Sequence, residues 1–556
     1  MKKYTVLILL GIIVLAGFLR VWRLDQHDVV TDEVFYGYRS IALIDSLNSP
    51  YQSTPFEWFE EIPWWAHVSF HDHPPLGFWV QHLFFKVFGN DLLAMRLPFA
   101  LAGVASVLLI YFIAKRLFAS EKVGLGAALL LAVSNYHVWI SRIGLQESLV
   151  IFLLLLCVHL FLKSLENDRY FYWTAAALGL AVLMKYTSIV AVPIFLLYLY
   201  SRRRELLTWK KLLIASGLFL AIISPVIIYN IGLYSARGHF DFQLSYFLKQ
   251  NVPEWEVRPG REIGGLGDKL SNLFRNFWNY AGPVAFVGMF VSVLAAGFRR
   301  KEQGYFFSGI VFLLFFLLFL AVGPQERFLA MLVPFWAVVI SALLFQWRNQ
   351  RFGYIFFCLV LFLELGISVN TNLKVNPLGE QGREYTFLRR ESNIWGYNQL
   401  EDFFLSETAG KYPKFSFPLK FSFTDALQQE ALQRARERGL TENHTLFVAD
   451  SRIHGPAYLW YFTRYTVYER WPIIEDKNFL AATAADPDFF AKQGFERVVY
   501  FQAGDTLLRP DSDNLGFEGM EKETGLSVLP PKFVTSPNGK IAFRVYEWPL
   551  METEGE

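Results

Sequence analysis

Two adjacent carboxylates, Asp32 and Glu33, lie just beyond the first long apolar run, in the stretch Val30-Thr31-Asp32-Glu33-Val34-Phe35-Tyr36-Gly37. Acidic residues stabilise the first turn of a helix through its dipole, so a helix start with Thr31 as its N-cap accounts for the pair. A general base accounts for it equally well, because a carboxylate can accept the proton of an attacking hydroxyl group. Low polarity at a membrane edge would favour that role by raising the pKa of the carboxylate. Both interpretations stay open for this motif.

A second group of polar residues opens the stretch His71-Asp72-His73-Pro74-Pro75. Proline is common at the first positions of a helix, so the two prolines predict a helix start. Imidazole and carboxylate groups suit divalent ions, which makes His71, Asp72 and the more distant His239 candidate metal ligands. The alternative is a helix N-terminus that faces a phosphate, with a histidine assisting. We expect no obligatory cofactor, and a divalent metal ion is the open alternative.

Isolated cations lie in or beside apolar runs, at Arg96, Arg142, Lys185 and Arg327. A charge within a membrane span is costly, so such residues indicate a function. Lys185 follows the apolar run Ala181-Val182-Leu183-Met184, where it either extends its amine to the membrane surface or binds a lipid-linked phosphate. For Arg142, the leading alternative to a functional role is a structural ion pair with the nearby Glu147.

The composition predicts the elements that must position these residues. Of the 556 residues, 53% are hydrophobic and 18% are charged, and long apolar runs alternate with short basic clusters. A membrane helix needs about 20 mostly apolar residues. Candidate spans cover residues 4–22, 73–88, 92–115, 123–140, 145–163, 170–200, 211–235, 280–298, 304–322, 327–347 and 353–370.

The run 170–200 is too long for one ordinary crossing. It is either two short helices broken near Lys185 or one long tilted helix, which gives 11 to 13 transmembrane helices in all. The N-terminal apolar run has no small-residue cleavage site after it, so we interpret it as a retained first helix rather than a signal peptide. The sequence therefore predicts a mostly α-helical, polytopic membrane bundle.

Basic clusters orient the predicted bundle, because Lys and Arg concentrate in cytoplasmic loops. The basic start puts the N-terminus in the cytoplasm and the loop 23–72 outside it, and the clusters at 202–204 and 299–301 place the loop 236–279 and the tail after residue 370 outside as well. Helices are expected within these loops at 32–47, at 56–65 and in His239–Phe247, where aromatic residues recur at helical spacing.

From about residue 371 the apolar runs shorten to the length of strands, at 445–449, 497–501 and 541–545. Helical stretches rich in Gln, Arg and Glu alternate with them, as at 425–438. This pattern predicts a C-terminal soluble α/β domain at 371–556, which follows a membrane module at 1–370. A basic domain or RNA-binding signature is absent from the sequence, so nucleic acid is not an expected partner.

Taken together, these motifs resemble the GT-C membrane glycosyltransferases, and most of all the branch with protein O-mannosyltransferases and lipid A aminoarabinose transferases (glycosyltransferase family 39-like). That branch carries an Asp-Glu pair in the first external loop, as at Asp32-Glu33, and an acidic or histidine-containing stretch before Pro-Pro, as at His71–Pro75. Later motifs follow in family order: Arg96-Leu97-Pro98, Ser141-Arg142 with Glu147, Gly179–Lys185, Arg327-Phe328 and Leu332-Val333-Pro334.

The ordered motifs cover about residues 1–340, and two positions depart from the family pattern. The aminoarabinose branch has Glu-Lys before Pro-Pro, where this chain has Asp72-His73, so a permanent cation is replaced by a titratable one. The acid after Ser-Arg is usually Asp in the family, and here it is Glu147. These departures weaken any transfer of donor or acceptor identity.

The resemblance implies a donor sugar on a polyprenyl or dolichyl phosphate within the membrane lipid. It implies that Asp32 acts as the base, with Glu33 in support, and that the anomeric configuration inverts. The implied phosphate-binding residues are His73, Lys185, Arg327, Arg96 and Arg142. The acceptor hydroxyl, on a protein, lipid or glycan, stays unknown, and a prokaryotic plasma membrane is the expected location.

Two other functions compete with this one. A transporter or flippase of lipid-linked sugars would also need cations within the membrane, but it predicts internal symmetry, and no repeat is visible in the sequence. A membrane scaffold whose tail binds a partner would leave Asp32-Glu33 and His71–His73 without a role.

Overall fold

The computed structural model describes residues 3–47, 52–203, 208–255, 264–453, 455–504, 507, 515–526 and 529–550. The side chain of Thr31, the predicted N-cap, lies outside the described residues, as do parts of the loops 23–72 and 236–279 and of the basic cluster at 202–204. The chain divides into two compact units: residues 1–25 with 39–391, and residues 26–38 with 392–556.

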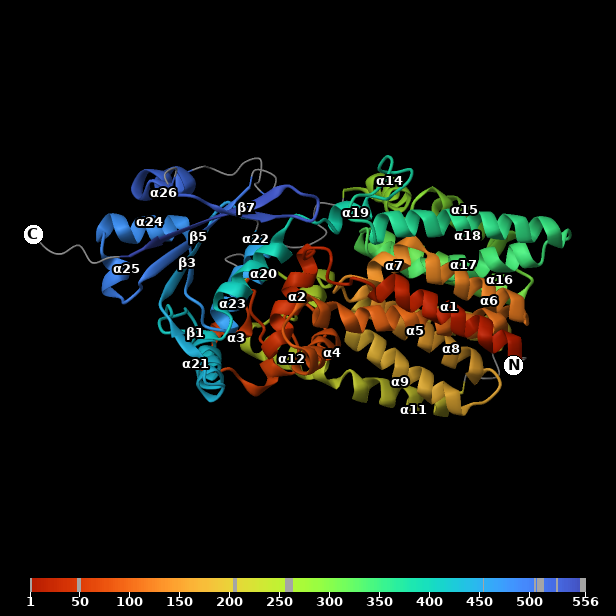
Figure 1. The fold of residues 1–556 in the computed structure, drawn as a ribbon. Helices are drawn as coiled ribbons and strands as arrows, with labels where there is room; N and C mark the ends of the chain where they lie inside the picture. The colour runs from red at the N-terminus through yellow and green to blue at the C-terminus, as the bar shows by residue number, and fades with distance from the viewer. Residues whose placement is uncertain are drawn as a thin grey trace, which may run out of the picture. The chain divides into compact units, whose positions relative to one another are not determined.

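The first unit is a bundle of apolar helices (Figure 1). Within the described residues, six helices are long and apolar enough to cross a membrane, or up to eight if each of two bent pairs is one span. The six are α1 (Lys3–Val21), α5 (Leu92–Phe118), α8 (Glu147–Ser164), α16 (Gln303–Val322), η5 with α17 (Phe328–Phe345) and α18 (Gln350–Asn372). The bent pairs are α6 (Glu121–Val133) with α7 (Asn135–Ser141), and α11 (Trp209–Ile222) with α12 (Ser224–Arg237).

The first unit also holds shorter helices: α3 (Pro55–Trp58), η1 (Trp64–His67), α4 (Leu76–Phe88), α9 (Arg169–Met184), η2 (Tyr186–Val190), α10 (Ala191–Arg202), α13 (Phe242–Phe247), α14 (Leu266–Asn276), η4 (Phe277–Ala281), α15 (Pro283–Phe298) and α19 (Leu388–Glu391). Helix α2 (Thr31–Ala42) is divided between the units, with residues 31–38 in the second and residues 39–42 in the first. The predicted mostly helical membrane bundle is confirmed. The number of 11 to 13 crossings stays a prediction, because length and composition do not decide whether the short helices cross.

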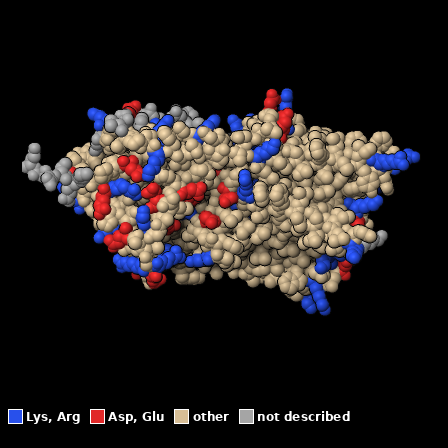
Figure 2. Space-filling model, in the orientation of Figure 1, with Lys and Arg blue, Asp and Glu red and all other residues tan. Residues whose placement is uncertain are grey.

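Charged side chains are sparse on the face of the bundle that Figure 2 shows. Basic residues gather at the end of the bundle that holds the N-terminus. This distribution is typical of helices whose sides face lipid and whose ends face water.

Breaks in the helices follow from local chemistry. Lys185 is extended (φ −161°, ψ 131°) between α9 and η2, so the run 170–200 is broken at this residue. Helices α11 and α12 bend by 64° where Pro225, in the first turn of α12, has no N–H to continue the ladder. Helices α6 and α7 bend by 61° at Ser134, and the buried Glu364 accepts the freed N–H of Asn135 at 3.1 Å.

The second unit is built on a five-stranded sheet in the order β4-β3-β5-β7-β6. Strands β3 (Thr445–Ala449), β4 (Ile473–Glu475) and β5 (Arg497–Ala503) are parallel, and β7 (Ile541–Pro549) runs antiparallel between β5 and β6 (Lys532–Thr535). The predicted strands at 445–449, 497–501 and 541–545 correspond to β3, β5 and β7, and helix α21 (Ser422–Glu437) occupies the predicted helical stretch at 425–438.

Crossover helices join the parallel strands, and a smaller sheet pairs β1 (Lys411–Pro413) with β2 (Thr441–Asn443). The remaining helices are α20 (Tyr397–Thr408), α22 (Gly455–Tyr458), η6 (Leu459–Thr463), α23 (Arg464–Tyr468), α24 (Asp476–Ala485), α25 (Phe489–Lys492) and α26 (Leu515–Thr524). The hydrophobic core lies between the sheet and α24, α25 and α26, around Phe479, Phe490, Val498 and Met520.

Residues 26–38 are part of this second unit, although the sequence assigned them to a loop of the membrane module. The Asp28 carboxylate accepts N–H groups from Trp395, Gly396 and Asn398 at 2.5, 2.9 and 3.0 Å. The hydroxyl of Tyr468 donates to the carbonyl of Tyr38 at 2.7 Å. Because these contacts are long-range, no local sequence pattern predicts them.

Candidate active site

Lys185 and Arg327 meet at one carboxylate, that of Glu147. Lys185 Nζ lies 2.5 Å from Glu147 Oε1, and Arg327 Nε lies 3.6 Å from the same oxygen. The ring of Phe328 lies beneath both cations, and its centroid is 4.5 Å from Lys185 Nζ and 5.5 Å from Arg327 Cζ. Glu147 opens α8, Lys185 stands at the break after α9, and Arg327 precedes η5, so three separate helix ends converge on one buried ion cluster.

Buried polar atoms without partners accompany this ion cluster. Glu147 Oε2, both polar side-chain atoms of Gln146 and the hydroxyl of Tyr136 have no hydrogen-bond partner among the described residues. All three side chains are buried. A buried polar group without a partner costs about 1–3 kcal/mol, so these atoms indicate a site for a polar ligand or ordered water.

Tyr186, the residue after Lys185, ties the ion cluster to the second predicted external loop. Its hydroxyl donates to Asp241 Oδ2 at 2.6 Å, and Asn230 Nδ2 donates to the same oxygen at 2.8 Å. Asp241 Oδ1 accepts the N–H of Leu244 at 2.9 Å, which caps α13. Burial raises the pKa of Asp241, and these hydrogen bonds to its charged form offset part of the rise.

Helix α13 also holds the polar stretch before the prolines. The N–H of Phe242 donates to the carbonyl of His71 at 2.7 Å, and Gln243 Nε2 donates to the carbonyl of Asp72 at 2.7 Å. One short helix therefore fixes both the backbone at His71–Asp72 and, through Asp241, the segment that carries Lys185. The prediction of a helix in His239–Phe247 is met by α13, which begins at Phe242.

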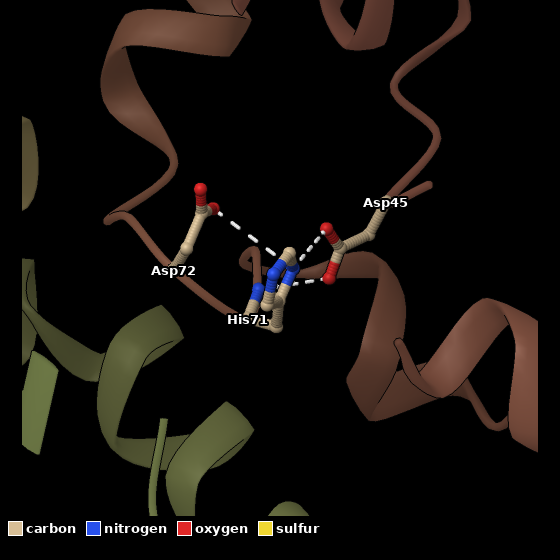
Figure 3. Close-up of side chains that lie close together, drawn as sticks. All are labelled: Asp45, His71 and Asp72. Atoms are coloured by element: carbon tan, nitrogen blue, oxygen red, sulfur yellow. Dashed lines mark hydrogen bonds and ion pairs between the residues drawn. The ribbon is translucent and has the colours of Figure 1, made fainter. Parts of the chain in front are cut away.

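A second ion cluster joins Arg39, Asp45, His71 and Asp72. Figure 3 shows the imidazole of His71 between the two carboxylates, with Nδ1 at 2.8 Å from Asp45 Oδ1 and 3.9 Å from Asp72 Oδ1. Arg39 binds Asp72 through Nη1 at 2.7 Å and Nη2 at 3.1 Å, and its Nη1 lies 3.3 Å from Asp45 Oδ1. The rings of Phe70 and Phe78 flank the guanidinium of Arg39, at 5.5 and 4.7 Å.

The charges of this cluster set its proton affinities. Burial lowers the pKa of His71, but Asp45 and Asp72 outweigh burial and raise it above the usual value. Burial raises the pKa of Asp72, but Arg39 and the two neighbouring histidines outweigh burial and hold it well below the usual value. His73 Nδ1 lies 3.0 Å from Asp72 Oδ2, so the predicted phosphate-binding histidine is held by the same carboxylate.

The donor set of this cluster does not fit a divalent metal ion. Asp45, His71 and Asp72 do offer ligand atoms within 4.8 Å of one another. However, the Arg39 guanidinium is in contact with both carboxylates, and a permanent cation there repels a metal ion. Within the described residues, the third predicted ligand, His239, is not part of this group and lies 3.6 Å from Glu254.

Arg142 and Arg96 have other partners than the sequence suggested. Arg142 donates to the carbonyls of Leu19, Arg20, Trp22 and Arg23, at 2.8 to 3.2 Å, and Arg96 donates to the carbonyl of Leu24 at 3.0 Å. These oxygens belong to the last turn of α1 and to the three residues that follow it, where carbonyl groups have no partner within the helix. The suggested ion pair between Arg142 and Glu147 is wrong, because Glu147 pairs with Lys185 and Arg327 instead.

Asp32 and Glu33 differ in their surroundings within the second unit. Both stand in the first turn of α2. Glu33 is fully buried and accepts the N–H of Val30 through Oε1 at 2.7 Å, which caps the start of the helix. Asp32 is half-buried. The helix-start interpretation of the pair therefore holds for Glu33.

Residues 72–229 match the family model described as dolichyl-phosphate-mannose-protein mannosyltransferase. The matched segment contains His73, Lys185 and Glu147, whereas Asp32 and Arg327 lie outside it. A crystal structure of ArnT from Cupriavidus metallidurans bound to undecaprenyl phosphate superimposes with a TM-score of 0.54 at 14% identity, and the match covers 98% of both chains. The chain has the GT-C glycosyltransferase fold.

Curated proteins match part of this GT-C chain. The proposed mannosyltransferase YycA of Bacillus subtilis is 30% identical over 35% of the chain, and the proposed mannosyltransferase YkcB of the same organism is 26% identical over 41%. The chain spans only 27% and 32% of the length of these two proteins. Its activity, substrates and partners are therefore not established by them.

Several residues of the GT-C chain's ion clusters were not singled out by the sequence. Arg39 and Asp45 lie in a stretch that gave only a helical pattern, and Tyr186 follows the conspicuous Lys185. The local signal at Arg39 is weak: it is the basic residue of α2, four positions after Phe35. Glu147 was noticed, but with the wrong partner.

Proposed function

We propose that this GT-C chain is an inverting glycosyltransferase that moves a sugar from a polyprenyl- or dolichyl-phosphate donor to a hydroxyl group. The observation that carries the proposal is the meeting of Lys185 and Arg327 at a buried carboxylate, beside polar atoms that have no protein partner. A lipid phosphate that leaves within a membrane needs cations where water is scarce, because charges interact more strongly at low dielectric.

The proposed reaction has one displacement step. The acceptor oxygen attacks the anomeric carbon, the bond from that carbon to the phosphate oxygen breaks, and the configuration inverts. Asp32 takes the proton of the acceptor hydroxyl. The lipid phosphate leaves with the bonding electron pair, and Lys185 and Arg327 stabilise its developing charge.

Each remaining residue has a proposed part that agrees with its contacts. Glu33 caps α2 and so orients the turn that carries Asp32. His73, held by Asp72, assists at the phosphate when protonated. Arg96 and Arg142 act from further away, because their guanidinium groups bind backbone carbonyls just after the end of α1. No step in this proposal uses a metal ion, since the donor set around His71 does not fit one.

The proposed setting is the extracytoplasmic face of a prokaryotic plasma membrane. The chain is an integral, multi-pass membrane protein, and ArnT from Cupriavidus metallidurans binds undecaprenyl phosphate. A bound polyprenyl phosphate in a protein of the same fold supports a donor of this chemical class here. The sugar and the acceptor are open parts of the proposal.

The test supplies purified protein with a radiolabelled polyprenyl-phosphate sugar and compares the wild type with Asp32→Asn and Lys185→Met. Loss of transfer by about 100-fold or more is expected for Asp32→Asn, since general-base catalysis contributes about 10²–10⁴-fold. Donor binding should persist in Asp32→Asn and weaken in Lys185→Met. Full transfer by Asp32→Asn would remove the assigned base.

Two controls separate the competing outcomes. A chelator in the same assay should leave transfer unchanged. Movement of the intact lipid-linked sugar across vesicles, with no cleavage of the sugar–phosphate bond, would instead indicate a flippase and overturn the transferase proposal.

A further inference from the structure

A second feature of the membrane bundle lies away from the proposed donor site. A groove of about 1380 Å³ runs between α15, α17 and α18. These three helices contact one another, and Figure 1 shows them side by side in the green part of the chain. None of the residues that line the groove is Glu147, Lys185, Arg327 or His73.

Apolar and polar side chains line different parts of the groove. Valine, leucine, isoleucine, tryptophan and phenylalanine side chains line most of its length, from Trp347 and Phe356 onwards. The charged and amide side chains of the lining all lie at one end, at Asn370, Lys374, Arg383 and Glu384. On α18, the lining from Phe356 to Asn370 is about 21 Å long at 1.5 Å per residue. That exceeds one leaflet of the hydrocarbon core, which is about 15 Å deep.

The polar end of the groove is a fixed structure rather than a loose loop. Asn370 is buried, and its Nδ2 donates to the carbonyls of Leu378 and Glu384 at 2.8 and 3.1 Å. Its Oδ1 accepts the N–H of Leu378 at 2.8 Å. These three bonds hold the segment 378–384 across the end of the groove.

Two cations and two carboxylates lie at this end of the groove, and Lys374 is the cation that faces no carboxylate within the described residues. Arg383 is exposed and pairs with Glu380 at 3.1 Å, and the exposed Glu384 accepts the N–H of Glu380 at 2.8 Å. Lys374 is half-buried, and it has no ion pair or hydrogen bond with any residue of the described segments. A half-buried ammonium group at the mouth of an apolar groove is complementary to a phosphate that carries hydrocarbon chains.

We propose that this groove is a binding site for an anionic phospholipid of the surrounding bilayer, with its acyl chains along α15, α17 and α18 and its phosphate at Lys374. The apolar lining accounts for the chains, and Lys374 accounts for the head group. The donor lipid is assigned elsewhere, to the cations at Glu147, so the groove does not depend on the proposed transferase activity.

Gly366 gives a direct way to fill the groove. It lines the groove from the middle of α18, and a Cβ atom added to it would meet nothing within 4 Å. The Cβ atom of Gly366→Leu therefore enters the groove without a clash, its longer side chain takes up space that a lipid chain would need, and leucine is a better helix former than glycine. Gly11→Leu is the matched control, because Gly11 in α1 also has open space at its Cβ and is not part of the groove.

The experiment measures lipid binding to the full chain in detergent by native mass spectrometry, with phosphatidylglycerol, phosphatidylcholine and undecaprenyl phosphate as separate probes. The wild type and Gly11→Leu should retain phosphatidylglycerol in preference to phosphatidylcholine. Gly366→Leu should lose it, and Lys374→Ala should bind it about fivefold more weakly, the effect of one basic residue near an anionic lipid.

Three outcomes would overturn the proposal. Equal retention of the two phospholipids by the wild type would mean ordinary contact with bulk lipid. Unchanged phosphatidylglycerol binding by Gly366→Leu would place the lipid elsewhere. Displacement of phosphatidylglycerol by undecaprenyl phosphate, with the same dependence on Lys374, would assign the groove to the donor lipid. The experiment measures lipid binding alone, so its result does not depend on whether a variant transfers sugar.

Discussion

Arg39 holds Asp72 through two nitrogen–oxygen contacts, with Nη1 at 2.7 Å and Nη2 at 3.1 Å. This bidentate contact links Arg39 on α2 to the residue that directly precedes His73. The guanidinium of Arg39 is fully buried and is flanked by two phenylalanine rings. A guanidinium matches a carboxylate in this way because its donors lie in one plane with a fixed spacing. The cluster is thus organised around an arginine rather than a metal ion.

Removal of Arg39 should destabilise the membrane unit strongly. In Arg39→Met, the buried Asp45 and the half-buried Asp72 lose the guanidinium that contacts both and keep only the His71 imidazole between them, and breaking a buried pair costs roughly 3–5 kcal/mol. Thermal unfolding in detergent measures the loss, and Arg39→Lys should recover only part of it because lysine cannot form the bidentate contact. Arg383→Met, which removes the exposed pair with Glu380, should change stability by less than about 1 kcal/mol. Equal melting temperatures for Arg39→Met and the wild type would contradict the assignment.

The raised pKa of His71 predicts a pH dependence of stability. Because Asp45 and Asp72 favour its protonated form in the fold, the stabilisation is fully present below the unfolded pKa of about 6.5 and is lost as pH rises through the folded value. The melting temperature should therefore fall as pH rises above about 6.5. His71→Gln should flatten that part of the profile. A variant with the wild-type profile would show that another group titrates.

Glu147→Gln should tighten the binding of polyprenyl phosphate. The carboxylate now neutralises Lys185 and Arg327, so a phosphate must compete with it for the same cations. Hydrogen bonds to charged groups are worth about 1.5–3 kcal/mol, which corresponds to about a tenfold to hundredfold lower Kd. Titration with undecaprenyl phosphate measures this directly. Glu302→Gln, which changes an exposed pair with Arg299, is the control, and a weaker Kd in Glu147→Gln would refute the competition.

Tyr186→Phe should loosen the connection between the Lys185 segment and α13. The change removes one hydrogen bond to the buried Asp241 and leaves the one from Asn230, at a cost of about 1–3 kcal/mol. On the proposed function, KM for the donor should rise with little change in kcat, because Tyr186 positions Lys185 without touching the reacting atoms. Tyr234→Phe, in a tyrosine that is half exposed and stacks on Phe240, should behave as wild type. A selective fall in kcat would assign Tyr186 to the chemistry instead.

The sequence located most membrane helices because apolar runs of about 20 residues are unambiguous. For the run 170–200 it left two alternatives, a break near Lys185 or one long tilted helix, and the structure has the break. The sequence predicted the helices of the external loop 23–72 less accurately. The helix expected at 32–47 ends at Ala42, and the short α3 and η1 stand in place of the one expected at 56–65. Helices outside the bilayer depend on tertiary contacts, such as the hydrogen bonds that Asp45 makes with His71.

For the site, the residue types were visible in the sequence, but their partners were not. Lys185 and Arg327 stand out as charges in apolar surroundings, whatever the fold. Their meeting at Glu147 joins positions up to 180 residues apart, and only the packing of three helix ends creates it. Arg142 shows the converse, because its nearest acid in sequence is not its partner in the fold.

The sequence by itself determined that this chain is a membrane helix bundle with a C-terminal α/β region and buried cations, because hydrophobic length and charge are properties of local segments. The tertiary structure decided which carboxylate each cation meets, that Arg39 contacts both carboxylates beside His71, and that residues 26–38 are grouped with the C-terminal region. The physical reason is that ion pairs and hydrogen bonds act over a few ångströms in space, and the distance along the chain carries no information about them.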